Sequence, residues 1–377
     1  MRLISTAHLR HNDILGKSIM NGRNQILLNE GVVLTERLIK RLIDLGIPYV
    51  YVREAKTGHI IPESSCSDEI RHESIEAIED TFAQVGNSST ISEGSFVMEK
   101  ASQKFMKLIR SILGELREKK ELLNLLADVY TYDQYIFTHS FNVTLYTLAI
   151  GMEMGLTHKQ LEQLGMGAIL HDVGKMHVGK EILLKPGKLT AEEYEEIKRH
   201  SENGYRMLKD VPNLPLLVAH CAYQHHERIN GSGYPRGLQG KDIHLYGKII
   251  AVADVFDAVT TNRIYRKAML PHEALEILYA GAGTLFEQDI VEAFRNSVAV
   301  YPVGLTVILN DRRVGVVVRQ NNGTSNRPVV YIIEDNGVPL EEPYELNLMK
   351  TLDIVITDCD TTMYEPGGVQ PGQQPNE

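Results

Sequence analysis

The sequence predicts a mainly α-helical protein, in which an all-helical bundle is flanked by a small N-terminal α+β module and a small C-terminal β domain. Three observations predict this fold class. Residues 122–296 carry a succession of apolar patterns at helical spacing. Residues 1–60 alternate apolar and polar positions in short runs, which is typical of strands. Residues 300–358 are rich in Val, Ile and Tyr, with stretches of period two.

The composition limits the class of protein. A chain of 377 residues is long enough for two or three domains and a sizeable core. Its net charge of −10 argues against the basic face that DNA binding requires. No apolar run approaches the length of a membrane span, and the N-terminus lacks the apolar core of a signal peptide. The three cysteines are far apart, as in a protein with reduced thiols, so we expect a cytoplasmic location.

The first third of the chain predicts two segments. In the N-terminal module of residues 1–60, Asn21-Gly22 predicts a hairpin turn and residues 35–47 a short amphipathic helix. Residues 61–121 are predicted to be a helical linker, with a Ser/Gly-rich surface loop at residues 84–95. The linker ends in a long helix with an apolar stripe. That stripe fits a homodimer and packing within one chain equally well.

Metal-capable side chains are concentrated in the predicted bundle. They are His139, His171, Asp172, His200, His225, His226 and Asp254. They lie on or beside several predicted helices, which is how metal sites in the cores of helical bundles are built. Imidazole and carboxylate suit cations such as Fe, Mn and Zn. A single histidine is more often an ordinary core or surface residue, so the prediction depends on the whole set.

Groups that suit a phosphate or a nucleotide accompany these ligands. Lys175 follows directly after the His171-Asp172 pair, where its ammonium can meet a phosphate. A loop with Gly233, Tyr234 and a following proline succeeds His225-His226, and tyrosine can stack on a purine. Beyond Asp254, two arginines are either bidentate phosphate ligands or solvated charges at a helix end. These arginines are Arg263 and Arg266.

Three motifs carry a family resemblance. HDVGK at 171–175, HHERINGSGYP at 225–235 and ADVFDAVTTNRIYR at 253–266 occur in this order. They resemble the HD-GYP subgroup of the HD phosphohydrolase superfamily, over residues 122–296. The resemblance implies an all-helical HD-type bundle with a centre of two or three Fe or Mn ions. It also implies cleavage of cyclic di-GMP to pGpG or GMP.

The resemblance also implies how the ligands are divided. One metal is expected among His139, His171, Asp172 and Asp254, and a second among His200, His225 and His226, with Asp172 bridging the two. Two cations about 3.5–4 Å apart can generate hydroxide near neutral pH and offset the charge of a phosphodiester. A metal-bridging hydroxide is therefore the expected nucleophile, with Lys175 on a non-bridging phosphate oxygen. The expected substrate contacts are Lys175, Gly233, Tyr234, Arg263 and Arg266.

Two positions depart from the family pattern. Some members with three metals carry a glutamate four residues before the first histidine ligand, where this chain has Tyr135. Tyrosine is a poor third-metal ligand here, so we expect a binuclear site of two divalent ions, Fe or Mn. Family members often have proline where this chain has Ile264, a change that removes no functional group.

Two other functions compete with a cyclic di-GMP phosphodiesterase. One is a module that senses the dinucleotide, or docks a diguanylate cyclase of the GGDEF type, without turnover. The other is an HD hydrolase of a different nucleotide, such as 3′,3′-cyclic GMP-AMP. The complete ligand set disfavours a sensor or docking module without turnover. A hydrolase of a different nucleotide stays open, because the motifs do not determine which purine is bound.

The end of the chain predicts a change of structure. In residues 300–358, Asn310-Asp311, Asn322-Gly323 and Asn336-Gly337 mark turns between strands. Residues 359–377 are rich in Pro, Gly and Gln and lack apolar content at their end, so we expect a disordered tail.

Overall fold

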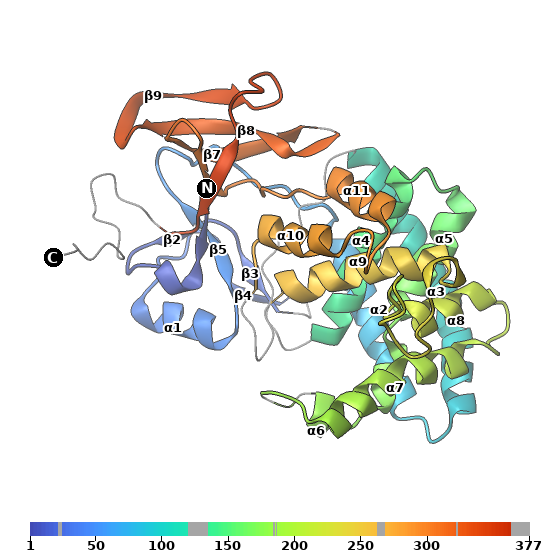
Figure 1. Cartoon of the computed structure of the whole chain (residues 1–377). Helices are drawn as coiled ribbons and strands as arrows, with labels where there is room; N and C mark the ends of the chain where they lie inside the picture. The colour runs from blue at the N-terminus through green and yellow to red at the C-terminus, as the bar shows by residue number, and fades with distance from the viewer. Residues whose placement is uncertain are drawn as a thin grey trace. The chain divides into compact units, whose positions relative to one another are not determined.

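The computed structural model describes most of the chain, in two compact units. The described residues are 1–21, 25–119, 135–183, 185, 187–261, 268–321 and 323–362. The first unit comprises residues 1–19, 27–63 and 301–377, and the second comprises residues 20–26 and 64–300. The described residues are mainly helical, as the sequence predicted, and Figure 1 shows their order along the chain.

The N-terminal strands form a small antiparallel sheet in the order β1-β5-β2. Its strands are β1 (Arg2–Ser5), β2 (Ile14–Leu15) and β5 (Tyr49–Arg53). A short ladder pairs β3 (Ile19–Met20) with β4 (Ile26–Leu28). The predicted amphipathic helix is α1 (Glu36–Asp44), which follows the 3-10 turn η1 (Thr6–His8). Thr35 caps α1, because its side chain accepts a hydrogen bond from the backbone N–H of Leu38 at 3.4 Å. The predicted turn at Asn21-Gly22 extends outside the described residues.

The C-terminal strands form a five-stranded antiparallel sheet in the order β10-β6-β7-β8-β9. They are β6 (Thr306–Leu309), β7 (Arg313–Asn321), β8 (Thr324–Asp335), β9 (Val338–Asn347) and β10 (Ile356–Asp360). Asn336 and Gly337 join β8 to β9 with φ of 48° and 81°, the positive values that a tight hairpin turn requires. Strand β10 extends to Asp360, so the predicted tail begins two residues too early, and residues 363–377 lie outside the described residues.

The two terminal segments are joined in the first unit. The backbone N–H of Leu3 donates to the carbonyl of Gly304 at 2.8 Å. The Tyr51 hydroxyl donates to the carbonyl of Val303 at 3.0 Å. The two segments therefore fold together, although the sequence patterns treat residues 1–60 and 300–358 as separate.

The second unit is a helical bundle. Its helices are α2 (Asp68–Gly86), α3 (Ile91–Lys119), α4 (Tyr135–Glu153), α5 (His158–Leu170), α6 (Lys180–Leu183), α7 (Ala191–Leu208), α8 (Leu216–Gln224), α9 (Leu245–Thr260), α10 (Pro271–Gly281) and α11 (Gln288–Ser297), with the 3-10 turns η4 (Val173–His177) and η5 (Gly240–Asp242). Helix α4 packs against α5 and α9, and α8 packs against α7 and α9. Most residues of α4 and α9 are buried, as expected of helices that are apolar on most sides and lie in the core of a bundle.

The linker is more helical than its composition suggests. The predicted loop at residues 84–95 is largely wrong, because α2 continues to Gly86 and α3 begins at Ile91. Thr90 and Glu93 account for the early start. The Glu93 N–H donates to the Thr90 hydroxyl at 3.2 Å, while the Ser89 N–H donates to the Glu93 carboxylate at 2.7 Å. The apolar stripe of α3 is buried within this unit, where α3 packs against α2, α5 and α7.

A search of the described helices for one long and apolar enough to cross a membrane finds none.

Candidate metal centre

The bundle brings the seven predicted ligands together from five parts of the chain. Helix α4 carries His139, the end of α5 leads into His171 and Asp172, and α7 carries His200. His225 and His226 follow α8, and α9 carries Asp254. Two of these helices start at a capping box, α5 at Thr157 and α7 at Thr190. These caps set where each helix begins and hence where its ligand lies.

A glycine allows two ligand-bearing segments to approach. A Cβ atom added to Gly174 would lie only 2.0 Å from the backbone carbonyl oxygen of His200. Any other residue at position 174 would therefore push η4 away from α7. This contact keeps Asp172, just before η4, next to His200.

The ligand atoms form two adjacent groups. We call His139, His171 and Asp254 the first ligand group, and Asp172, His200, His225 and His226 the second ligand group. Within each group, one donor atom per residue lies within 4.8 Å of all the others. All seven side chains are buried except that of His226, which is partly exposed.

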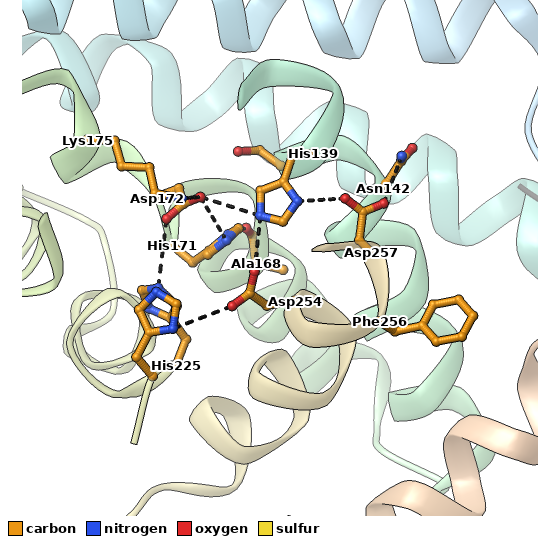
Figure 2. A network of polar contacts seen from close by, with 12 residues as sticks. His139, Asn142, Ala168, His171, Asp172, Lys175, His225, Asp254, Phe256 and Asp257 are labelled. Atoms are coloured by element: carbon orange, nitrogen blue, oxygen red, sulfur yellow. Dashed lines mark hydrogen bonds and ion pairs between the residues drawn. The ribbon is translucent and has the colours of Figure 1, made fainter. Parts of the chain in front are cut away.

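Asp172 lies between the two groups, with one carboxylate oxygen directed to each (Figure 2). Its Oδ2 is 3.5 Å from His139 Nε2 and 3.4 Å from His171 Nε2. Its Oδ1 is 3.4 Å from His200 Nε2 and 3.8 Å from His225 Nε2. A single carboxylate can therefore serve both groups.

Asp254 also reaches both groups. One of its oxygens is 3.1 Å from His139 Nε2, and the other is 3.6 Å from His226 Nδ1. The two acids thus link the five imidazoles of both groups into one cluster of donor atoms.

The arrangement fits divalent cations. Within the described residues, His171 Nε2 and Asp172 Oδ1 are buried without a hydrogen-bond partner. Buried polar atoms are seldom left unsatisfied, and a cation would satisfy both. The donors are imidazole nitrogens and carboxylate oxygens, a set that Fe, Mn and Zn accept. Their spacing of 3.4–3.8 Å around Asp172 suits atoms that converge on ions between them.

Contacts on the far side of each imidazole orient it. The Nδ1 atoms of His171 and His200 each lie 2.6 Å from a backbone carbonyl, those of Ala168 and Ile197. Because a carbonyl only accepts, each Nδ1 carries a proton, and the contact fixes each ring so that its Nε2 faces the ligand cluster.

His139 differs, because a carboxylate supports it. Its Nδ1 lies 2.6 Å from Asp257 Oδ2, and Asn142 Nδ2 donates to the other oxygen of Asp257 at 3.0 Å (Figure 2). The sequence analysis did not single out Asp257. The sequence did contain a sign of its role, because Asp257 is a second acid three residues after Asp254 and so lies on the same side of a largely apolar helix.

The charges shift the pKa values in opposite directions across the site. Burial lowers the pKa of His139, but the hydrogen bonds that its ring N–H groups donate to Asp254 and Asp257 outweigh burial and raise the pKa to about 9. Burial lowers the pKa of His200 to about 4. Burial opposes ionisation of Asp172, yet Lys175 and His171 hold its pKa well below the usual range. Asp172 and Asp254, whose pKa values are both held well below the usual range, therefore stay ionised, and His200 stays neutral, at neutral pH.

The predicted substrate contacts have different surroundings. Lys175 donates to Asp172 Oδ2 at 2.5 Å, so its ammonium lies at the edge of the ligand cluster. The Tyr234 ring lies 4.6 Å from the His226 ring. A Cβ atom on Gly233 would lie 2.4 Å from the backbone of His226. Close backbone packing within the chain is therefore enough to require glycine at this position, without a contact to substrate. Arg263 and Arg266 lie outside the described residues.

A buried acid that the sequence analysis also missed anchors the glycine-rich loop. Glu227 accepts hydrogen bonds from the backbone N–H groups of Arg236 and Leu238, both at 2.9 Å. Its side chain is buried, and these two contacts bind the far end of the loop to the histidine pair. In the sequence, the sign of this role was that Glu227 is an acid directly after His225-His226.

Two family profiles match the chain. The profile described as HD domain matches residues 112–290. The profile described as KOW domain associated with HD domain matches residues 306–363, the region of β6 to β10. Residues 112–290 of the chain therefore match the HD-domain family.

Individual proteins similar to the chain are named as phosphodiesterases of cyclic dinucleotides. A cyclic di-GMP phosphodiesterase of Pseudomonas aeruginosa is 38% identical over 217 residues, 58% of this chain and 52% of that protein. One of Thermotoga maritima is 37% identical over 201 residues, 53% of each chain. A 3′3′-cGAMP-specific phosphodiesterase of Vibrio cholerae is 40% identical over 174 residues, 46% of this chain and 40% of that protein.

These relatives agree with the motifs. Together with the HD-domain match over residues 112–290, they support the predicted resemblance to HD-GYP phosphodiesterases. The chain spans about half the length of the first two relatives. Among solved structures, an HD-GYP-like protein of Bdellovibrio bacteriovorus is a distant match, with 20% identity, a TM-score of 0.45 and coverage of 78% of this chain and 97% of that one.

Proposed function

We propose that the protein is a metal-dependent phosphodiesterase that hydrolyses cyclic di-GMP to pGpG, GMP or both at a binuclear centre. The observation that carries this proposal is the position of Asp172, which directs one oxygen to each ligand group. A shared carboxylate is the feature expected of two neighbouring cations. The activities that the relatives' names state support the choice of reaction.

The two cations would be Fe or Mn, held by the seven residues of the two ligand groups. When bound, they would supply a bridging hydroxide near neutral pH and offset the charge of the phosphodiester. His171 and His200 are held with Nε2 facing inward by backbone carbonyls. Asp172 and Asp254 remain ionised and balance the positive charge of the metals.

The remaining groups would bind the substrate. Lys175 has three N–H donors, of which Asp172 uses one, so its ammonium can also meet a non-bridging phosphate oxygen. Tyr234 covers the His226 side of the site, where it can contact a nucleotide. Arg263 and Arg266 are proposed as further phosphate ligands, because a guanidinium fork matches two phosphate oxygens.

The test is product analysis with metal-loaded protein. Protein purified without oxygen and loaded with Fe or Mn should convert cyclic di-GMP to pGpG or GMP, as followed by chromatography. Asp172→Ala should abolish turnover while circular dichroism shows intact helices. His158→Ala removes an exposed imidazole outside the site and should leave the rate unchanged. Metal-loaded protein that turns over no cyclic dinucleotide would overturn the proposal.

Two alternatives are outcomes of the same experiment. Cyclic di-GMP that binds in calorimetry without turnover would favour a sensor or a docking module for diguanylate cyclases. The match to a 3′3′-cGAMP-specific phosphodiesterase supports a second candidate substrate. Faster turnover of 3′,3′-cyclic GMP-AMP than of cyclic di-GMP would favour it.

A further inference from the structure

A lysine beside the ligand cluster lies between two tyrosine rings. Lys198 Nζ is 5.2 Å from the centroid of the Tyr194 ring, one turn earlier on α7. The same atom is 5.7 Å from the centroid of the Tyr234 ring in the glycine-rich loop. Lys198 also pairs with Glu195 on its own helix. The two rings and the ammonium join α7 to the loop.

This cluster is continuous with the second ligand group. The Tyr234 ring is tilted by 31° to the His226 ring at 4.6 Å, and it meets the His200 ring edge-on at 6.4 Å. From the ligands outward, the order is therefore imidazoles, Tyr234, Lys198 and Tyr194. A molecule whose phosphodiester lay at the ligands would extend along this row.

The outermost ring is open to solvent. Tyr194 is 49% exposed, an unusual position for a large aromatic side chain that serves only to fill a core. An exposed aromatic ring offers a surface on which a purine stacks, and every base has such a face. A lysine ammonium donates well to the O6 and N7 acceptors of guanine, whereas adenine presents a donor in place of O6.

We propose that Tyr194 and Lys198 form a guanine-binding subsite next to the metal centre. The base stacks on Tyr194, and Lys198 donates to its O6 and N7 edge. Tyr234 closes the side of the subsite that faces the ligands. This inference rests on the function proposed above and deepens it, because it names residues that select the nucleobase.

The test compares substrates with and without a guanine. Wild-type and variant proteins are assayed with cyclic di-GMP, with cyclic di-AMP, which has no guanine, and with bis(p-nitrophenyl) phosphate, a phosphodiester without a base. Tyr194→Ala should raise KM for cyclic di-GMP about tenfold, with little change in kcat. It should leave metal content and the turnover of bis(p-nitrophenyl) phosphate unchanged. Tyr194→Phe keeps the ring and should stay close to wild type.

The lysine has its own readout. Lys198→Met should raise KM for cyclic di-GMP but not for cyclic di-AMP, because cyclic di-AMP has no guanine O6 and N7 edge to accept from Lys198. Lys198→Arg keeps a cationic donor and should restore part of the preference. Glu195→Gln removes only the ion-pair partner of Lys198 and should not raise KM.

Three results would overturn the subsite. The first is an unchanged KM in Tyr194→Ala. The second is an equal loss with all three substrates, which indicates a structural role. The third is a Lys198→Met protein with unaltered preference between the dinucleotides.

The subsite can be tested even if the proposed phosphodiesterase function is wrong. If the metal-loaded wild-type protein turns over no dinucleotide, calorimetric binding of cyclic di-GMP still compares wild type with Tyr194→Ala. Weaker binding by the variant then supports the subsite. Equal affinity, or no binding by either protein, overturns it.

Discussion

The two ligand groups differ in the support of one histidine, His139, because His171 of the first group has a backbone carbonyl behind it as the second group does. In the second group, His200 and His225 direct Nδ1 toward backbone carbonyls at 2.6 and 3.1 Å. In the first group, His139 directs Nδ1 toward the carboxylate of Asp257 at 2.6 Å. A neutral carbonyl fixes the direction of the ring, whereas a carboxylate also makes the imidazole more basic.

The difference is visible in the protonation of the two groups. The acids around His139 raise its pKa to about 9, whereas burial lowers the pKa of His200 to about 4. Burial also lowers the pKa of His225 and His226 well below the ordinary value. Without metal, the first group therefore holds a proton at neutral pH and the second does not. We expect the two groups to respond differently to pH and to substitution.

The largest effect should come from the residue that both groups share. Asp172→Ala removes one oxygen from each group and leaves Lys175 without its ion-pair partner. We expect the metal content to fall below one ion per chain and turnover to be lost. Elemental analysis of the purified variant checks this, with circular dichroism as a control for folding. Two ions per chain in the variant would show that Asp172 does not bridge.

Substitution of Asp257 should separate the two groups. Asp257→Asn removes the carboxylate behind His139, so metal affinity in the first group should fall about 10- to 100-fold. Affinity in the second group should be unchanged, which leaves close to one ion per chain at limiting metal. Asn142→Ala removes only the donor behind Asp257 and should have a smaller effect. Equal losses from both groups would contradict the distinction.

The pH dependence of metal binding should distinguish the groups as well. His139 must release its proton to bind a cation, so affinity in the first group should rise about tenfold per pH unit from pH 7 to its pKa of about 9, and then level off. The second group should release no such proton in this range. Calorimetry in buffers with different ionisation heats counts the protons released. A count near zero at pH 7.5 would be incompatible with a protonated His139.

The smallest expected effect concerns the loop beside the second group. Glu227→Gln keeps one acceptor oxygen for the backbone N–H groups of Arg236 and Leu238. Its amide NH2 replaces the other oxygen and faces the second N–H group, so that two donors meet and one hydrogen bond is lost. We expect KM for cyclic di-GMP to rise about fivefold through the displaced loop, with unchanged metal content. Steady-state kinetics and elemental analysis check this. Metal loss without a change in KM would assign Glu227 to the support of the ligands instead.

The sequence allowed the ligand set to be predicted because motif spacing marks residues of one chemistry on successive helices. It also carried the capping box at Thr190, which sets the start of α7. Asp257 escaped notice because its role depends on the rotation of α9 against α4, which only packing determines. Thr90 and Glu93 carried a capping signal that the Ser/Gly-rich composition around them concealed.

The joining of the chain ends was beyond sequence reasoning. Contacts such as Leu3 with Gly304, and Arg2 Nε with Thr306 Oγ1 at 3.0 Å, link residues about 300 positions apart. Local patterns such as the Asn336-Gly337 turn predict strands and hairpins, but they carry no information on which distant strands share a unit. The sequence therefore predicted the elements of the first unit without its assembly.

The most direct measurement is a titration of metal-free protein with Fe or Mn under anaerobic conditions, in which the rate of cyclic di-GMP hydrolysis is recorded at each ratio of metal to protein. Two cations that act together through Asp172 predict little turnover up to one equivalent and a plateau at two. A plateau at one equivalent, or no hydrolysis at any ratio, would contradict a binuclear phosphodiesterase.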